Sequence, residues 1–174
     1  MPSRKIIIEP DPILRKKCEP LEHIDNDVRK LMNDMLTTMY EAPGIGLAAI
    51  QVGILKRIVV VDTSKDDENK NPLFLVNPEI IHKSKETSVY EEGCLSLPGQ
   101  FAEIERPAEC RVKYIDYEGK ANNLEATGLL ATCIQHEVDH LNGILFIDYL
   151  SKLKKDMIIK KLVKQKKDIE RIVV

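Results

Sequence analysis

Two histidines and a glutamate stand at a spacing that suits metal chemistry, in the segment Gln135-His136-Glu137-Val138-Asp139-His140. Residues four apart lie above one another on one face of a helix, so His136 and His140 can present two imidazoles to one point. Glu137 lies one residue further round, where a carboxylate can take a proton from water without binding the metal itself. This H-E-x-x-H pattern therefore predicts a two-histidine metal clamp with Glu137 as its general base.

The helix that must carry this motif, from about Gly128 to Leu141, is largely apolar around it. Leucine, cysteine and isoleucine precede the histidines, and further leucine and isoleucine follow them. Polar side chains on a buried helix need partners. The surroundings therefore favour a metal site over a chance match on a solvated helix.

A catalytic metal of this kind needs a third protein ligand beside water. The longer zinc-peptidase motif would supply a third histidine, but Phe146 stands at that position. A cysteine or a carboxylate is therefore expected instead. Cys133 is too distant, because it lies about 7.5 Å along the helix axis from a metal between His136 and His140, whereas its reach is about 5 Å.

Cys94 has a distinctive setting, because Gly93 and Pro98 bracket a short segment around it and shape its backbone. With its neighbours it forms the second of three blocks that resemble the bacterial peptide deformylases: Gly44-Ile45-Gly46-Leu47-Ala48-Ala49-Ile50-Gln51, Glu92-Gly93-Cys94-Leu95-Ser96 and Gln135-His136-Glu137-Val138-Asp139-His140-Leu141. All three occur in this order, and the resemblance runs from about Arg4 to Leu150.

The resemblance implies a metal-dependent release of formate from the N-terminal formylmethionine of nascent polypeptides. Three residues would bind one divalent metal: Cys94, His136 and His140. The ion would be Fe²⁺ in the cell, with Zn²⁺, Ni²⁺ or Co²⁺ as substitutes in purified protein, since a thiolate softens the site. Glu137 would act as base and acid, while the Gln51 amide and the backbone N–H of Leu95 would stabilise the oxyanion.

The resemblance also implies a substrate site, in which the backbone edge of the first block pairs with the bound peptide. An apolar pocket for the methionine side chain would be lined by these residues: Ile45, Gly46, Tyr90, Glu92, Leu95, Leu129, Cys133 and His136. Two positions depart from the commonest family pattern, namely Tyr90, often a smaller aliphatic residue, and Phe101, often an arginine. We also predict that Arg106 pairs with Glu92 and holds the Cys94 loop in place.

The remaining elements predict an α+β fold, with antiparallel strands around the central metal-binding helix. An N-terminal helix is expected where apolar residues from Val28 to Met39 recur at helical spacing, behind a cap at Asp25 or Asn26. Its methionines are expected to be core. Strands are expected at residues 57–63, 73–76, 79–90, 102–105, 111–117 and 122–126, with 64–71 as a solvated loop.

A basic C-terminal helix is expected, because residues 151–174 hold nine Lys and Arg against three Asp and Glu, a net charge of +6 against −8 for the rest. One apolar stripe could be formed by Leu153, Met157, Leu162, Ile169 and Val173. We expect this helix to complete the single domain whose catalytic part is residues 1–150. The resemblance implies docking on the ribosome near the tunnel exit, which a cationic face suits, and docking on the body is equally compatible.

Length and composition exclude other classes of protein. The 174 residues suit one domain, and no apolar run is long enough to span a membrane. The apolar run near the N-terminus is too short for a signal peptide, and four cysteines without paired spacing fit a reducing compartment. We therefore expect a monomer in the bacterial cytoplasm rather than in an organelle.

Two other functions fit part of the pattern. A zinc peptidase would take its third ligand from a carboxylate, for which Asp148, Asp156 and Glu170 are the candidates. A non-enzymatic, metal-stabilised ribosome-binding module would fill all four metal positions with protein ligands. The substitution Cys94→Ala separates the three, because it should abolish deformylation, spare such a peptidase, and unfold a structural site.

Overall fold

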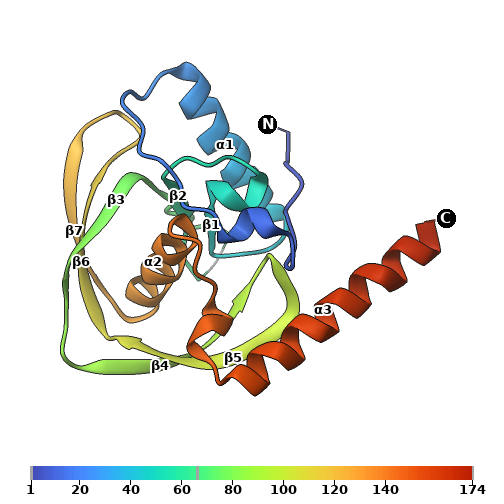
Figure 1. The fold of residues 1–174 in the computed structure, drawn as a ribbon. Helices are drawn as coiled ribbons and strands as arrows, with labels where there is room; N and C mark the ends of the chain where they lie inside the picture. The colour runs from blue at the N-terminus through green and yellow to red at the C-terminus, as the bar shows by residue number, and fades with distance from the viewer. Residues whose placement is uncertain (1, 66, 174) are drawn as a thin grey trace.

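Two antiparallel sheets and three α-helices make up the fold (Figure 1). The computed structural model describes residues 2–65 and 67–173, with the backbone alone described for Val173. The α+β class predicted from the sequence is confirmed, and so is the helix over Gly128–Leu141. Within the described residues, no helix is both long and apolar enough to cross a lipid bilayer.

The larger sheet has the order β1-β2-β3-β6-β7, and all its neighbours are antiparallel. Its strands are β1 (Gly46–Ala48), β2 (Ile58–Val61), β3 (Leu73–Lys83), β6 (Glu109–Ile115) and β7 (Ala121–Thr127). The smaller sheet pairs β4 (Thr87–Cys94) with β5 (Leu97–Pro107). The helices are α1 (Asn26–Glu41), α2 (Gly128–Leu141) and α3 (Lys152–Val173), and short 3₁₀ turns occupy Pro12–Arg15, Ala49–Val52 and Phe146–Tyr149.

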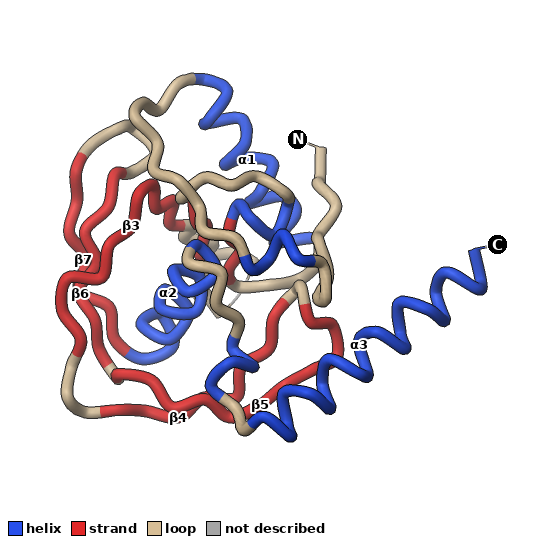
Figure 2. Tube along the Cα trace, in the orientation of Figure 1, coloured by secondary structure: helices blue, strands red, loops and turns tan. Residues whose placement is uncertain are grey.

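The strand β2 separates two layers of the core. Its side chains alternate between the faces of the sheet, as the period of a strand requires. Ile58 and Val60 pack in the cluster that contains α1, whereas Val59 and Val61 pack in the cluster that contains α2. Helix α2 thus lies inside the fold, with strands of both sheets around it (Figure 2), and this position removes its motif from bulk water.

Helix α1 begins at the cap that the sequence predicts. The Asp25 side chain accepts a hydrogen bond from the Val28 N–H at 2.9 Å, which satisfies an unpaired donor of the first turn. The helix ends at Glu41, just before Pro43. Its three methionines, Met32, Met35 and Met39, are fully buried core residues, as expected for side chains that fill irregular gaps.

The predicted boundaries of the strands at 73–76 and 79–90 are wrong, because one strand spans the gap between them and the chain leaves the large sheet in the middle of 79–90. Strand β3 ends at Lys83 and β4 begins at Thr87 in the other sheet. In the turn between them, the Ser84 hydroxyl donates to the Glu86 carbonyl at 2.8 Å. Residues 82–88 are all polar, so the sequence carried a turn signal here that a single long strand does not account for. Strand β5 also extends further, over Leu97–Pro107, than the predicted 102–105.

The predicted apolar stripe of the C-terminal helix is mostly wrong. Only Leu162 of that stripe is buried, whereas Leu153, Met157 and Ile169 are exposed, and the Val173 side chain lies outside the described part. Ile158 packs beside Leu162 in a third cluster with residues of β5 and the 146–149 turn. The first half of α3 therefore contacts the body, and its second half projects away from it (Figure 1).

Candidate metal centre and substrate cavity

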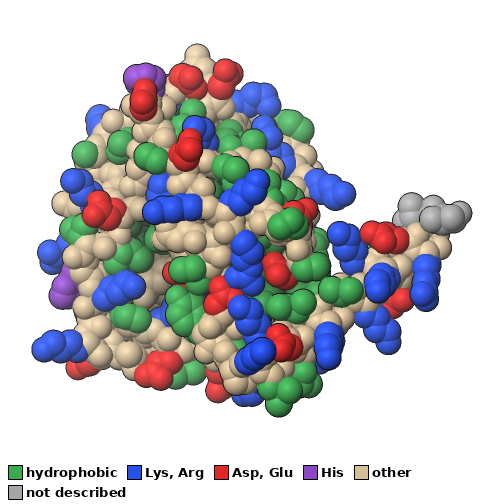
Figure 3. Space-filling view, viewed as in Figure 1, with side chains coloured by type: hydrophobic (Ala, Val, Ile, Leu, Met, Phe, Trp, Pro, Cys, Tyr) green, Lys and Arg blue, Asp and Glu red, His purple; other side chains and the backbone are tan. Residues whose placement is uncertain are grey.

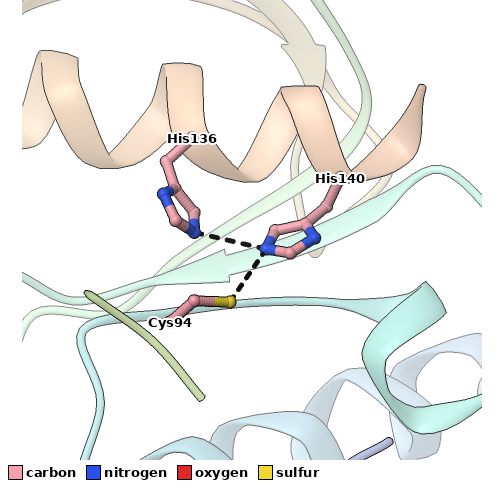
Figure 4. Close-up of side chains that lie close together, drawn as sticks. All are labelled: Cys94, His136 and His140. Atoms are coloured by element: carbon pink, nitrogen blue, oxygen red, sulfur yellow. Dashed lines mark hydrogen bonds between the residues drawn. The ribbon is translucent and has the colours of Figure 1, made fainter. Parts of the chain in front are cut away.

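Three potential metal ligands from two elements converge at the heart of the fold (Figure 4). His136 and His140 extend from one face of α2, and Cys94 faces them from the end of β4. The Cys94 Sγ lies 3.3 Å from His140 Nε2, which lies 3.2 Å from His136 Nε2. All three donor atoms lie within 4.8 Å of one another. Within the described ranges, no other group of three such residues is placed to hold a metal.

These separations suit a tetrahedral metal. Two imidazole nitrogens at about 2.0 Å from a tetrahedral ion lie roughly 3.3 Å apart, and a nitrogen and a thiolate sulfur lie about 3.5 Å apart. Both histidines are buried, and Cys94 is half-buried. A soft thiolate and two imidazoles are a donor set for Fe²⁺, Co²⁺, Ni²⁺ or Zn²⁺ rather than for Mg²⁺ or Ca²⁺. The residues present therefore fit a divalent transition metal.

The electrostatics prepare the two histidines differently. Burial, aided by the positive charge on His136, lowers the pKa of His140 well below its ordinary value, so its imidazole is neutral and its lone pair is available. Burial would also lower the pKa of His136, but hydrogen bonds with Cys94 and Glu92 outweigh it and raise that pKa. The Glu92 carboxylate accepts from His136 Nδ1 at 2.8 Å. This contact fixes the ring and leaves Nε2 facing the cluster.

A buried charge network extends from His136 to the surface. Arg106 donates to both carboxylate oxygens of Glu92, at 2.7 and 3.0 Å, so the predicted pair is present. Arg106 also donates to Asp139 at 2.9 Å, and the Tyr149 hydroxyl donates to the same Asp139 oxygen at 2.6 Å. Burial would raise the pKa of Glu92, but His136 and Arg106 outweigh it and hold it below its usual value.

Glu137 lies beside the cluster without belonging to it. Its Oε1 is 4.0 Å from His136 Nε2, and its Oε2 is buried without a hydrogen-bond partner in the described part of the chain. Burial raises the pKa of Glu137 to about 7. A carboxyl group in this range can both accept and release a proton near neutral pH.

Gln51 is held so that its amide N–H₂ faces the cysteine. Its Oε1 accepts from the Ala48 N–H at 2.9 Å, and its Nε2 donates to the Ser96 hydroxyl at 3.0 Å. The same Nε2 lies 3.5 Å from Cys94 Sγ. Ser96 is fully buried, and its place in the second block did not by itself indicate a role.

A cavity of about 400 Å³ opens beside the three ligands. All eight predicted pocket residues line it: Ile45, Gly46, Tyr90, Glu92, Leu95, Leu129, Cys133 and His136. Gln51, Glu137 and Cys94 line it too. Strand β1, at one edge of the large sheet, and β4 of the two-stranded sheet both border the cavity. Among the described strands each has one hydrogen-bonded neighbour, and an extended peptide can add to the other edge of such a strand.

Gly46 permits the close packing of β1 on α2 at this cavity. A Cβ on Gly46 would lie 2.6 Å from Glu137 Oε1 and 2.8 Å from Cys133 Sγ. Cys133 is buried in the cavity wall, with its thiol 3.6 Å from the Ile45 carbonyl. The glycine of the first block is thus required by the glutamate of the third.

The structure also shows contacts that sequence reasoning missed. Asp139 lies within the third block, on a helix predicted to be largely buried. A carboxylate in that position needs a cationic partner, and the structure shows that Arg106 is this partner. Tyr149 offered no such signal, because it reaches Asp139 only through the path of the chain after α2. Asp148, a candidate ligand of the peptidase alternative, instead pairs with Arg15 at 2.6 Å and Lys155 at 2.8 Å.

Comparison with known proteins agrees with this geometry. A family model described as polypeptide deformylase matches residues 3–156. The chain belongs to this family. It is 61% identical to the peptide deformylase of Pelagibacter ubique over 174 residues, with 100% of both chains covered. It is 58% identical to that of Rhizobium meliloti over 167 residues, with 96% of both covered.

Solved structures of deformylases share the fold. The crystal structure of peptide deformylase from Ehrlichia chaffeensis superposes with a TM-score of 0.91 at 41% identity, covering 95% of this chain and 98% of that one. A second structure of the Ehrlichia enzyme, in complex with actinonin, gives a TM-score of 0.91 at 43% identity with the same coverage. The family is one of metal-dependent hydrolases, and the cluster of Cys94, His136 and His140 fits that chemistry.

Proposed function

We propose that this chain hydrolyses the formyl amide of N-terminal formylmethionine on nascent polypeptides and releases formate. The observation that carries the proposal is the convergence of one thiol and two imidazole nitrogens beside a buried carboxyl group, at the floor of an apolar cavity. That arrangement supplies a metal site, a proton acceptor and a side-chain pocket within one space. Membership of the deformylase family supports the same reaction.

The residues Cys94, His136 and His140 would hold one divalent metal. When bound, the ion would supply Lewis acidity and lower the pKa of water, so that a hydroxide nucleophile is available at neutral pH. We assign Fe²⁺ as the physiological ion, as the family resemblance implies, within a donor set of one thiolate and two imidazoles that also accepts Zn²⁺, Ni²⁺ or Co²⁺. Glu92 and Arg106 act as positioning residues, because they fix the ring of His136 from behind.

Glu137 moves the proton. Its pKa of about 7 lets the carboxylate accept a proton from the attacking water at its unpartnered oxygen. It then gives this proton to the amine that leaves, so that formate and a free N-terminus result. The two transfers return Glu137 to its starting state, as catalysis requires.

Gln51 and Leu95 stabilise the negative charge that develops on the formyl oxygen. The Gln51 Nε2 is already fixed toward the cavity by Ala48 and Ser96, so little reorganisation is needed. The backbone N–H of Leu95, next to Cys94, is the second donor of the proposal. The methionine side chain occupies the apolar cavity, and the substrate backbone pairs with the edges of β1 and β4.

The direct test measures formate release from formyl-Met-Ala-Ser, together with metal content, for anaerobically purified wild type, Glu137→Ala and Glu137→Gln. We expect both variants to keep one metal per chain and to lose about 10²- to 10⁴-fold in rate. Their stability should not fall, because an ionisable group is removed from a buried position. A wild-type protein that carries metal but releases no formate would overturn the proposal.

The substitution Cys94→Ala tests the ligand set and the two alternatives together. Deformylation and metal binding should both be lost while the fold remains, since the core does not depend on the metal alone. Retained peptide-bond cleavage would favour a carboxylate-ligated peptidase. Unfolding of the variant would favour a structural metal site.

The setting of the reaction follows from its substrate. Formylated chains are made in bacterial translation, so we place the enzyme in the bacterial cytoplasm as a monomer, near the ribosomal tunnel exit. The projecting half of α3 carries Lys and Arg side chains along its length (Figure 3), and a cationic helix suits an RNA-rich surface. Ribosome cosedimentation that falls steeply with salt, and that is lost without residues 164–174, is the expected result.

A further inference from the structure

A second groove lies next to the substrate cavity and has no role in the reaction described above. It encloses about 460 Å³ between β5 and the first half of α3. Residues 101–103 of β5 form one side, and Leu150, Met157 and Ile158 form the other, with Lys154 and Lys161 also lining it. The groove is thus mainly apolar in its walls and basic on its helical side.

Phe101 joins this groove to the substrate cavity, because its side chain lines both. It pairs across the hairpin with Gly93, the residue before Cys94. A Cβ on Gly93 would lie 2.5 Å from the Phe101 ring, so the ring covers the glycine backbone and is held there. Even so, Phe101 is 63% exposed. An apolar ring is therefore fixed at the mouth of the cavity and faces solvent.

The groove continues this apolar surface onto α3. Met157 is 50% exposed and lies opposite Phe101 across the groove. Covering such side chains is favourable by about 25 cal/mol for each Å² removed from water. Methionine adapts its shape to varied partners, so it suits a surface that must accept different side chains.

We propose that this groove binds the nascent chain downstream of its first three residues and favours apolar side chains there. The inference rests on the proposed function, since the substrate enters through the mouth that Phe101 borders. Phe101 lines both spaces, so a chain that extends out of the substrate cavity past this ring reaches the groove that Met157 lines. Substrate selection would thereby extend beyond the methionine pocket.

A polar pocket on the other side of the mouth is a less suitable path. It encloses about 230 Å³ and contains Tyr40, Asp62 and Lys70. The Tyr40 hydroxyl already donates to Asp62 at 2.5 Å, and the Lys70 ammonium lies 4.1 Å from the centroid of the Tyr40 ring. These groups satisfy one another, and they offer little apolar surface for a passing side chain.

The test compares three substrates: formyl-Met-Ala-Ser, the same peptide extended by Leu-Leu-Ser, and the same peptide extended by Ser-Ser-Ser. The variant is Met157→Asp, and the matched control is Leu153→Asp on the same helix, which is 72% exposed and does not line the groove. We expect wild type to prefer the leucine extension roughly fivefold in kcat/KM. Met157→Asp should remove this preference and leave the tripeptide rate unchanged, and Leu153→Asp should keep both.

Equal kcat/KM for the two extensions in wild type would overturn the proposed role of the groove. An equal loss of the leucine preference in Met157→Asp and Leu153→Asp would overturn it too. If Lys70→Glu removes the leucine preference and Met157→Asp does not, the downstream chain binds in the polar pocket instead. Calorimetric binding of the deformylated product peptides tests the groove without turnover. Absence of turnover on the tripeptide, with a binding preference that Met157→Asp abolishes, would overturn the proposed function and support the groove.

Discussion

The helices α2 and α3 differ in composition and in place: α2 has two Asp and Glu side chains among 14 residues and lies inside the fold, whereas α3 has 12 charged side chains among 22 and leaves it. Ten of the fourteen residues of α2 are buried. In α3, with twenty-two residues, Ile158 and Leu162 are the buried ones among the described side chains. The higher charge of α3 keeps most of its side chains in water. The few polar groups inside α2 can be buried because neighbouring elements supply partners for them.

Two functional groups of α2 meet partners from other elements, while Glu137 keeps an oxygen at the site that has no partner among the described residues. His136 meets Glu92 of β4, and Asp139 meets Arg106 of β5. On α3, Lys155 pairs with Asp148 just before the helix, and the later turns extend beyond the body. Burial of polar groups is tolerated where they are paired. The comparison therefore predicts large effects for changes that unpair α2 and small effects for changes on the outer half of α3.

The largest effect on stability should come from Arg106→Ala, because it removes the buried cation that pairs with the carboxylates of Glu92 and Asp139. We expect about 3–5 kcal/mol of destabilisation in urea unfolding and a 10- to 100-fold weaker hold on the metal in chelator competition. Arg106→Lys keeps the positive charge but loses the two-point contact with Glu92. Its stability and metal retention should therefore lie between those of wild type and Arg106→Ala. Unchanged metal retention in Arg106→Ala would show that Arg106 does not position His136 for metal binding.

A pair of truncations on α3 tests its two halves against each other. Leu162→Ala should lower the free energy of unfolding by about 2–5 kcal/mol, because Leu162 is 1% exposed in the third core cluster. Ile169→Ala should change it by less than about 0.5 kcal/mol, since Ile169 is 62% exposed. The midpoints of urea unfolding for the two variants and wild type, measured under the same conditions, test this difference. Equal losses would mean that the outer half packs on the body in solution.

The contact of β1 with α2 can be broken by Gly46→Ala. The added methyl group would collide with Glu137 and Cys133, so we expect about 1–3 kcal/mol of destabilisation. Formate release should fall more than stability suggests, because Glu137 must move. The double variant Gly46→Ala with Cys133→Ala should recover stability in part but not activity. Full activity in the single variant would show that Glu137 tolerates displacement.

The smallest effect on the metal site should follow Tyr149→Phe, which removes one hydroxyl from the outer end of the charge network. The lost hydrogen bond to Asp139 is worth roughly 1 kcal/mol, since the tyrosine is half exposed and water can replace it. Metal retention should change by less than in Arg106→Ala, because Arg106 still reaches Asp139. A loss as large as that of Arg106→Ala would place Tyr149 among the principal supports of the site.

The amino-acid sequence by itself determined the elements whose causes are local. The cap at Asp25, the end of α1 before Pro43 and the span of α2 depend on neighbours along the chain. The spacing of His136 and His140 is likewise a property of one helix. The three blocks indicated the family because the reaction requires particular residue types, and these can be read from the sequence before their positions in space are known.

Only the tertiary structure decided which distant groups meet. The third donor Cys94, the pairing of Arg106 with both Glu92 and Asp139, and the contact of Tyr149 join residues far apart in the chain. The burial of Ile158 and Leu162 rather than the predicted stripe was decided in the same way. Helical periodicity shows that a face is apolar, but what covers that face depends on how β5 and the 146–149 turn pack against it.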